Sequence, residues 1–189
     1  MRRAIDVVVA GLALIVFTPV LLVAALAVWL EDRGSPLYLS TRIGRHRIPF
    51  RLVKLRSMVV NASGSGVDTT TASDRRVTCV GRVIRRLKLD ELPQLWNALK
   101  GDISLIGPRA EWSKCAERYE QTIPFYHFRH LVKPGITGWA QVNYPYGESD
   151  EDAVEKLKYD LYYIRHYSLK LDAMIVLKTL YTMLFGKGR

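Results

Sequence analysis

The most prominent pattern in the chain is a long apolar run near its start. Residues 7–30 are 24 consecutive positions without a charge. A straight helix of that length would measure about 36 Å at 1.5 Å per residue, enough to cross the roughly 30 Å hydrocarbon core of a bilayer. A buried core helix is the alternative, and a cleaved signal peptide fits less well because its apolar part is usually shorter. The run therefore predicts a membrane segment.

Pro19 lies in the middle of this run and predicts a kink, because proline lacks the backbone donor and clashes with the carbonyl four residues earlier. The hydroxyl of Thr18 offers a partner to a carbonyl left unpaired there. Arginines stand on both sides of the run, and positively charged flanks favour the cytoplasm. A re-entrant helix broken at Thr18-Pro19 puts both ends on one side and is the preferred prediction. An ordinary Pro-kinked transmembrane helix is the alternative. The flanking arginines are Arg2, Arg3, Arg33, Arg42, Arg45, Arg47 and Arg51.

After this segment the periodicity changes. Partial alternation around Gly44 predicts a β-hairpin over 37–55, and the polar residues 61–73 predict a loop. Apolar residues at helical spacing predict helices over 92–99, 149–161 and 169–185, the last apolar enough to lie on a bilayer surface. The expected fold is α+β and predominantly helical, with residues 1–35 as the membrane helix and 36–189 as a cytoplasmic domain.

Composition narrows the range of partners. The chain has 189 residues, 49% of them hydrophobic, which fits one ordinary domain with a real core and excludes wholesale disorder. Twenty-eight Lys and Arg against 18 Asp and Glu give a net charge of +10, which favours anionic partners. Cys79 and Cys115 are too few for a disulfide scaffold and are expected to be free thiols.

Two acid-free basic stretches converge on a pair of acids. Residues 41–58 and 75–88 each carry six Lys or Arg, and the second leads to Asp90 and Glu91. The first is expected to meet phosphate or lipid headgroups. Asp90 is expected near the N-terminus of the helix that follows, where phosphate is attracted and nearby cations keep the carboxylate ionised. Such a carboxylate can attack phosphorus, and Glu91 can hold Mg²⁺. The simpler alternative is that both acids only cap the helix.

Other motifs carry less weight. Asp150 and Asp152 have the D-x-D spacing of metal-binding glycosyltransferases, but Ser149 before them indicates a capping box. His127 and His130 lack the further ligands of a zinc site. A membrane-tethered basic module that binds anionic lipid or nucleic acid without catalysis would explain the charge but not the acids. No nucleic-acid-binding motif is recognised.

Three segments are similar to the monotopic phosphoglycosyl transferases, the bacterial sugar transferase family of glycan assembly: KLRSM (54–58), LDELPQLWNALKGDISLIGPR (89–109) and KPGITGWAQV (133–142). The resemblance implies a re-entrant membrane helix, amphipathic interfacial helices and a catalytic domain at the cytoplasmic face of a bacterial inner membrane. It implies Mg²⁺-dependent transfer of a sugar 1-phosphate from a UDP-sugar to polyprenol (undecaprenyl) phosphate, with release of UMP. Such a transfer is the first membrane step of exopolysaccharide, O-antigen or glycoconjugate assembly.

By the same resemblance Asp90 is the nucleophile and Glu91 the metal ligand. Thr18-Pro19 stands where the family has its helix-breaking dipeptide, often Ser-Pro. Ala110 replaces a proline that the family usually carries after Arg109, which predicts a looser loop. The sequence leaves open which sugar is used, whether the protein is a homodimer, and whether residue 1 is the natural start. Candidate phosphate or nucleotide contacts are Lys54, Arg56 and Arg109, and more weakly Arg86, Lys88, Gln94, Asn97 and Lys133.

Overall fold

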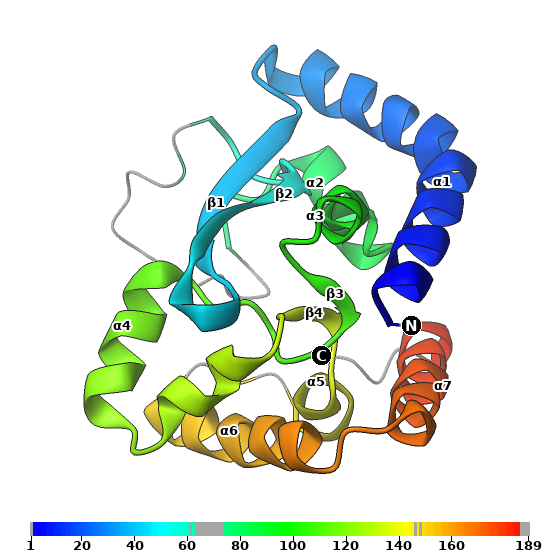
Figure 1. Ribbon diagram of the computed structural model, residues 1–189. Helices are drawn as coiled ribbons and strands as arrows, with labels where there is room; N and C mark the ends of the chain where they lie inside the picture. Colours follow the sequence, from blue (N-terminus) through cyan, green and yellow to red (C-terminus); the bar gives the residue numbers. More distant parts are fainter. Residues whose placement is uncertain (1, 61, 63–73, 146, 148, 186–189) are drawn as a thin grey trace. The chain divides into compact units, whose positions relative to one another are not determined.

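A computed structural model describes residues 2–60, 62, 74–145, 147 and 149–185, and it confirms a mostly helical α+β protein (Figure 1). Short 3₁₀ segments in the described part of the chain include η1 (Arg45–Arg47), η3 (Leu89–Glu91) and η4 (Tyr126–Leu131). In chain order the helices and strands are α1 (Arg2–Asp32), β1 (Leu37–Ile43), β2 (Pro49–Leu55), α2 (Cys79–Arg86), α3 (Gln94–Lys100), β3 (Ser104–Ile106), α4 (Ser113–Thr122), β4 (Gly135–Thr137), α5 (Trp139–Asn143), α6 (Asp150–Arg165) and α7 (Leu169–Phe185).

The chain divides into two compact units. The first contains Arg3–Ser40 and Leu52–Leu99, and the second contains Arg2, Thr41–Arg51 and the chain from Lys100 onward. The first unit therefore holds α1, α2, η3 and α3, and the second holds β3, β4 and α4 to α7. Strands β1 and β2 pair as a two-stranded hairpin whose base belongs to the first unit and whose tip belongs to the second.

The apolar run forms one continuous helix, α1, with Pro19 inside it. Figure 1 shows that α1 bends along its length, as a proline in a helix interior predicts. The hydroxyl of Thr18 donates to the carbonyl of Leu14 at 2.6 Å. This carbonyl lies one residue before the one that Pro19 deprives of its donor, so Thr18 supports the helix beside Pro19 rather than replacing the missing bond.

Both ends of α1 rest on other parts of the first unit. Near its start, Arg3 donates hydrogen bonds to the carbonyls of Ala98 and Leu99 at the end of α3. Near its end, Ala24 and Val28 are buried in one cluster with residues of β2 and α2. The middle of the helix is bare: only 11% of its most apolar 18-residue window is buried. In the described part of the chain, α1 is the one helix long and apolar enough to cross a membrane.

The second unit is built around two very short parallel strands. Ser104 of β3 pairs with Gly135 of β4. A Cβ atom at Gly135 would lie 2.1 Å from the backbone nitrogen of Gly107, so this close approach requires glycine. Helices α4 and α6 share a buried cluster with Tyr126, and α7 packs through a second cluster on Tyr163 of α6. These clusters support the turn that follows β3.

The sequence pattern predicted several elements well. The hairpin spans 37–55 and α7 spans 169–185, as expected, while α6 runs four residues further than predicted, to Arg165. Ser149 and Asp152 form the capping box that the sequence indicated. The β3–β4 pair was not predicted, because three-residue strands carry no readable alternation. Apart from Ala62, the predicted loop over 61–73 lies outside the described residues.

Candidate functional site

Strand β2 and the 3₁₀ turn η3 bring Lys54 to the acidic pair. The Lys54 ammonium lies 3.0 Å from the Glu91 carboxylate, and both side chains are mostly buried. Helix α3 holds β2 in place through Asn97. Its buried side chain accepts a hydrogen bond from the backbone nitrogen of Val53 at 3.0 Å. Asn97 therefore has a structural role next to the site, which accounts for its place in the motif.

Asp90 lies about one turn before the helix that follows it, not at the N-cap itself. Asp90 and Glu91 form a 3₁₀ turn preceded by Lys88 in the left-handed conformation (φ 57°), and α3 begins only at Gln94. Pro93 lies directly before that helix, where its missing backbone donor costs nothing. A phosphate attracted to this place would therefore be held mainly by side-chain cations, and a helix dipole contributes little from a seven-residue helix.

Burial dominates the electrostatics of Asp90. Removal from water raises the pKa of its carboxyl above the ordinary value, and the negative charge of Glu91 raises it further. The positive charges of Lys54 and Arg85 act in the opposite direction but do not cancel the rise. The cations expected around this carboxylate are thus present, and they limit the shift that desolvation causes.

Arg85 is the site residue that the sequence analysis missed. Its guanidinium donates to the hydroxyl of the buried Ser57 at 2.8 Å, and its charge acts on Asp90. Helix α2 reaches Ser57 because Gly81 lets the two backbones approach: a Cβ at Gly81 would lie 2.1 Å from the Ser57 carbonyl oxygen. The signal available in the sequence was the position of each arginine around helix α2. Arg85 lies next to the buried Ile84, whereas Arg86 is exposed.

The other predicted contacts of the first unit lie in different settings. Arg56 forms an ion pair with Asp32 at the end of α1, and only 11% of its side chain is exposed. Gln94 is buried, while Arg86 and Lys88 are exposed. Arg56 is therefore engaged by the protein itself, and Lys54 and Arg85 are the cations that accompany the acidic pair. Thr18 and Pro19 lie in the exposed middle of α1.

Much of the basic stretch 41–58 contacts protein groups, which differs from the expectation that it meets phosphate or headgroups. Arg42 is buried and donates to the carbonyl of Ala110. Arg45 donates to the carbonyl of Leu131, and Arg47 pairs with Glu120. Together with the pairs made by Lys54 and Arg56, these contacts show that the stretch holds the fold together as well as carrying charge.

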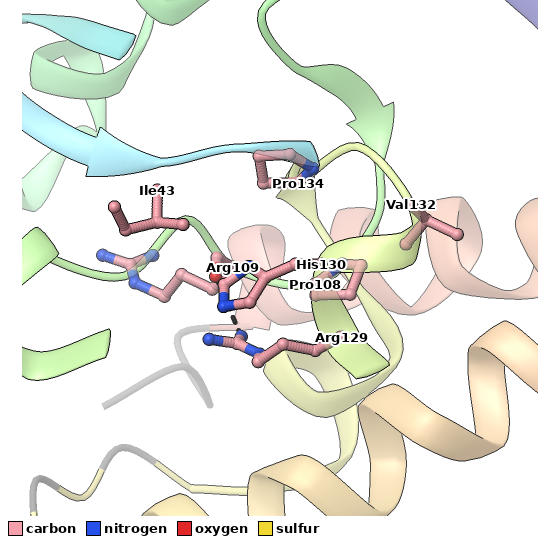
Figure 2. Close-up of a pocket in the computed structure, with 7 residues that line it drawn as sticks. All are labelled: Ile43, Pro108, Arg109, Arg129, His130, Val132 and Pro134. Carbon is pink, nitrogen blue, oxygen red and sulfur yellow. Dashed lines mark hydrogen bonds between the residues drawn. The ribbon is translucent and has the colours of Figure 1, made fainter. Parts of the chain in front are cut away.

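Arg109 and Lys133 belong to the second unit. Arg109 follows β3 in the turn Gly107-Pro108-Arg109, and its side chain is exposed. It borders a small hollow that Arg129 and His130 also line (Figure 2). Lys133 is half-buried in the segment that leads into β4. Burial and the neighbouring positive charges of Arg129, Arg47 and His127 lower the pKa of His130 to about 4 and keep it neutral.

The residues fit a Mg²⁺ ion shared with substrate better than a protein cage. Among the residues that the structure describes, no group of three or more His, Cys, Asp and Glu side chains could hold a metal. Mg²⁺ is often held by one or two carboxylates together with substrate phosphates and water. Asp90 and Glu91 match that donor set. The ion pair with Lys54 also balances the negative charge of Glu91.

The chain matches the family described as bacterial sugar transferase over residues 1–186. It is 44% identical over 99% of its length to the UDP-N-acetylgalactosamine-undecaprenyl-phosphate N-acetylgalactosaminephosphotransferase of Aeromonas hydrophila, covering 44% of that protein. It is also 44% identical over its full length to the UDP-glucose:undecaprenyl-phosphate glucose-1-phosphate transferase of Escherichia coli K12, covering 41% of it. The chain thus spans less than half the length of these two relatives. It covers 98% of the exopolysaccharide production protein PSS of Rhizobium leguminosarum bv. phaseoli, at 37% identity. This match over nearly the whole chain establishes that the protein belongs to the bacterial sugar transferase family.

Proposed function

We propose that the protein transfers a sugar 1-phosphate from a UDP-sugar to undecaprenyl phosphate, giving a polyprenol diphosphate sugar and UMP, and so begins the assembly of an exopolysaccharide or other glycoconjugate. The observation that carries the proposal is the Asp90–Glu91 pair, with Lys54 paired to Glu91 and the charge of Arg85 acting on Asp90. The relatives' named substrates supply the chemical classes of donor and acceptor.

In the proposed reaction the ionised Asp90 carboxylate attacks the phosphorus that bears the sugar. An acyl–phosphate bond forms, and the bond to the second phosphate breaks with its electron pair leaving on UMP. A phosphate oxygen of the polyprenol then attacks the same phosphorus. The acyl–phosphate bond breaks, and the Asp90 carboxylate is restored. Lys54 and Arg85 stabilise the negative charge that gathers around phosphorus, because cations in a water-poor site act strongly.

Glu91, with Asp90 beside it, is the group proposed to hold Mg²⁺. When bound, the ion would neutralise phosphate charge and make UMP a better leaving group. Arg109 and Lys133 are proposed as further phosphate or nucleotide contacts. Arg86, Lys88 and Gln94 stay weaker candidates, and the ion pair of Arg56 with Asp32 supports a structural role for that residue instead.

We further propose that α1 is re-entrant and that the protein is monotopic at the cytoplasmic face of the bacterial inner membrane. Arg3 near the start of α1 and Val28 near its end both contact the same compact unit. A helix that crosses a bilayer separates its ends by about 30 Å. The contacts of both ends with one unit therefore support a helix that enters and leaves on one side. The exposed apolar residues of α7 support an additional interfacial contact.

The test is UMP release from a panel of UDP-sugars in nanodiscs that contain undecaprenyl phosphate and Mg²⁺. Asp90→Asn should abolish release, since an amide cannot form the acyl phosphate. Glu91→Gln should leave less than about 1% of the rate, by the magnitude that removing a group stabilising the transition state usually costs. Release that survives Asp90→Asn would remove the proposed nucleophile. Absence of release with every sugar, together with salt-sensitive and Mg²⁺-independent binding of anionic lipid, would indicate a binding module instead.

A further inference from the structure

The turn that carries Arg109 is held by three successive carbonyl groups. Each one accepts a hydrogen bond from a different part of the second unit, so the main chain at 108–110 has few alternative conformations. The donors are the backbone nitrogen of Gly135 to Pro108 at 2.8 Å, the Arg129 guanidinium to Arg109 at 2.9 Å, and the Arg42 guanidinium to Ala110 at 3.1 Å.

These hydrogen bonds change the effect expected of alanine at position 110. A proline at this position would restrict the backbone by itself, and its replacement by alanine predicts a looser turn. Here the buried side chains of Arg129 and Arg42 fix the carbonyls of Arg109 and Ala110, which lie before and after the Ala110 Cα atom. The turn therefore obtains its rigidity from two guanidinium groups.

Arg129 is itself fixed more firmly than the turn. Its side chain is 5% exposed, and it pairs with the 3% exposed Asp160 of α6 at 2.8 Å. A further bond runs from its guanidinium to the Tyr126 hydroxyl at 2.7 Å. Burial raises the pKa of Asp160 to about 6, while the charge and hydrogen bonds of Arg129 oppose the rise. A buried pair of this kind is expensive to maintain unless its geometry is good and its remaining donors are satisfied.

Arg129 and Arg109 therefore have different tasks. Figure 2 shows the Arg129 guanidinium beneath the main chain of Arg109, with the dashed line marking its bond to the Arg109 carbonyl. The buried Arg129 donates to Asp160, Tyr126 and the turn, whereas the Arg109 side chain is exposed.

We propose that Arg129 is a positioning residue for Arg109: anchored by Asp160, it holds the Arg109 carbonyl so that the Arg109 guanidinium meets the diphosphate of the nucleotide in one orientation. The inference rests on the proposed function, in which Arg109 contacts the nucleotide sugar. Arginine binds phosphate best when its planar fork is already oriented, because less side-chain freedom is lost on binding.

Arg129→Lys tests the proposal with the least disturbance. Lysine keeps a positive charge for Asp160, but a single ammonium cannot also reproduce the bonds to the Arg109 carbonyl and to Tyr126. The KM for the UDP-sugar should rise about tenfold, with a smaller change in kcat, since misplacement of a contact by a fraction of an ångström costs that order of affinity. Asp160→Asn, which removes the anchor's charge, should act in the same direction.

The control for stability alone is Leu157→Ala. Leu157 lies in α6 one turn before Asp160, is buried, and packs in the cluster that α6 shares with α4. It should lower the melting temperature at least as much as Arg129→Lys and leave KM within about twofold of the parent. A KM that follows melting temperature across all three variants would overturn the proposal.

The decisive measurement is a double-mutant cycle with Arg109→Ala, read out as affinity for UDP by calorimetry. If Arg129 acts through Arg109, Arg129→Lys should cost about tenfold in the parent and less than about twofold in the Arg109→Ala background. Additive effects, or no binding of UDP, would overturn the inference. Coupling without UMP release from any UDP-sugar would refute the proposed transfer and leave the positioning role intact.

Discussion

At the scale of the single residue, His130 combines burial with positive surroundings. Desolvation and the charges of Arg129, Arg47 and His127 lower its pKa to about 4. Glu120 lies 3.5 Å away, but its carboxylate is already paired with Arg47. The imidazole is therefore held neutral in the folded protein at a pH where an unfolded chain, with an ordinary histidine pKa near 6.5, begins to protonate it.

This difference predicts an acid-sensitive contribution to stability. Because the folded pKa is depressed, the unfolded state binds more protons between about pH 6.5 and 4, so His130 lowers stability as pH falls through that window. The loss between pH 6.5 and 5 should be on the order of 2 kcal/mol. Melting temperature in detergent, measured at both pH values, should fall less in His130→Gln than in the parent.

The exposed His127 supplies the matched comparison. Its charge is one of those that lower the pKa of His130, so His127→Gln should weaken that effect, and its stability should fall less steeply with pH than the parent's but more steeply than that of His130→Gln. Equal responses from the parent and both variants would mean that the His130 imidazole protonates normally in the folded state.

Residue types and motifs indicated candidate positions for the chemistry but not which cation lies beside which acid. Asp90, Glu91 and Lys54 were predicted from motif and charge. Arg85 and Arg86 are indistinguishable as letters, and only the packing of α2 decides that Arg85 contacts Ser57 and acts on Asp90 while Arg86 faces solvent. The raised pKa of Asp90 likewise depends on burial, which charge counting does not contain.

At the scale of the element, α2 depends on one glycine. Gly81 is buried against the backbone of Ser57, and a methyl group there would lie 2.1 Å from the Ser57 carbonyl oxygen. Gly81→Ala should therefore push α2 away from β2, destabilise the protein by about 1–3 kcal/mol, and weaken the hold of Arg85 on Ser57. The variant should lose melting temperature and UMP release together.

Gly11→Ala is a suitable control, because an added methyl at that helical position meets only the Leu99 side chain at an ordinary 3.8 Å. It should be neutral or slightly stabilising, as glycine-to-alanine changes in helices usually are. A Gly81→Ala protein with the parent's melting temperature would show that α2 can move without cost.

Element prediction succeeded where a periodic pattern was long enough to read. The hairpin, α6 and α7 carry seven or more residues of alternation or helical spacing. Strands β3 and β4 have three residues each and are held by their parallel partner and by the close approach at Gly135. Their existence depends on contacts between segments about 30 positions apart, which no local pattern records.

At the scale of the whole molecule, the contacts of α1 decide how the protein can sit in a membrane. The apolar run and its proline predicted a membrane helix, and charge on both flanks predicted that its ends share one side. Neither observation says what holds the ends there. In the proposed re-entrant arrangement, the hydrogen bonds of Arg3 to α3 and the burial of Ala24 and Val28 against β2 and α2 would supply that restraint.

A topology experiment follows from this restraint. Single cysteines at Ala4 and Ser35, both exposed and near opposite ends of α1, are introduced into a chain with Cys79→Ser and Cys115→Ser. In inside-out vesicles an impermeant thiol reagent should label both, because a re-entrant helix keeps both ends at the cytoplasmic face. A cysteine at Val16, exposed in the protein but expected in lipid, should stay unlabelled. Labelling of Ala4→Cys only from the opposite face would mean that α1 spans the bilayer, and the bonds of Arg3 to α3 could not then exist in the membrane-bound protein.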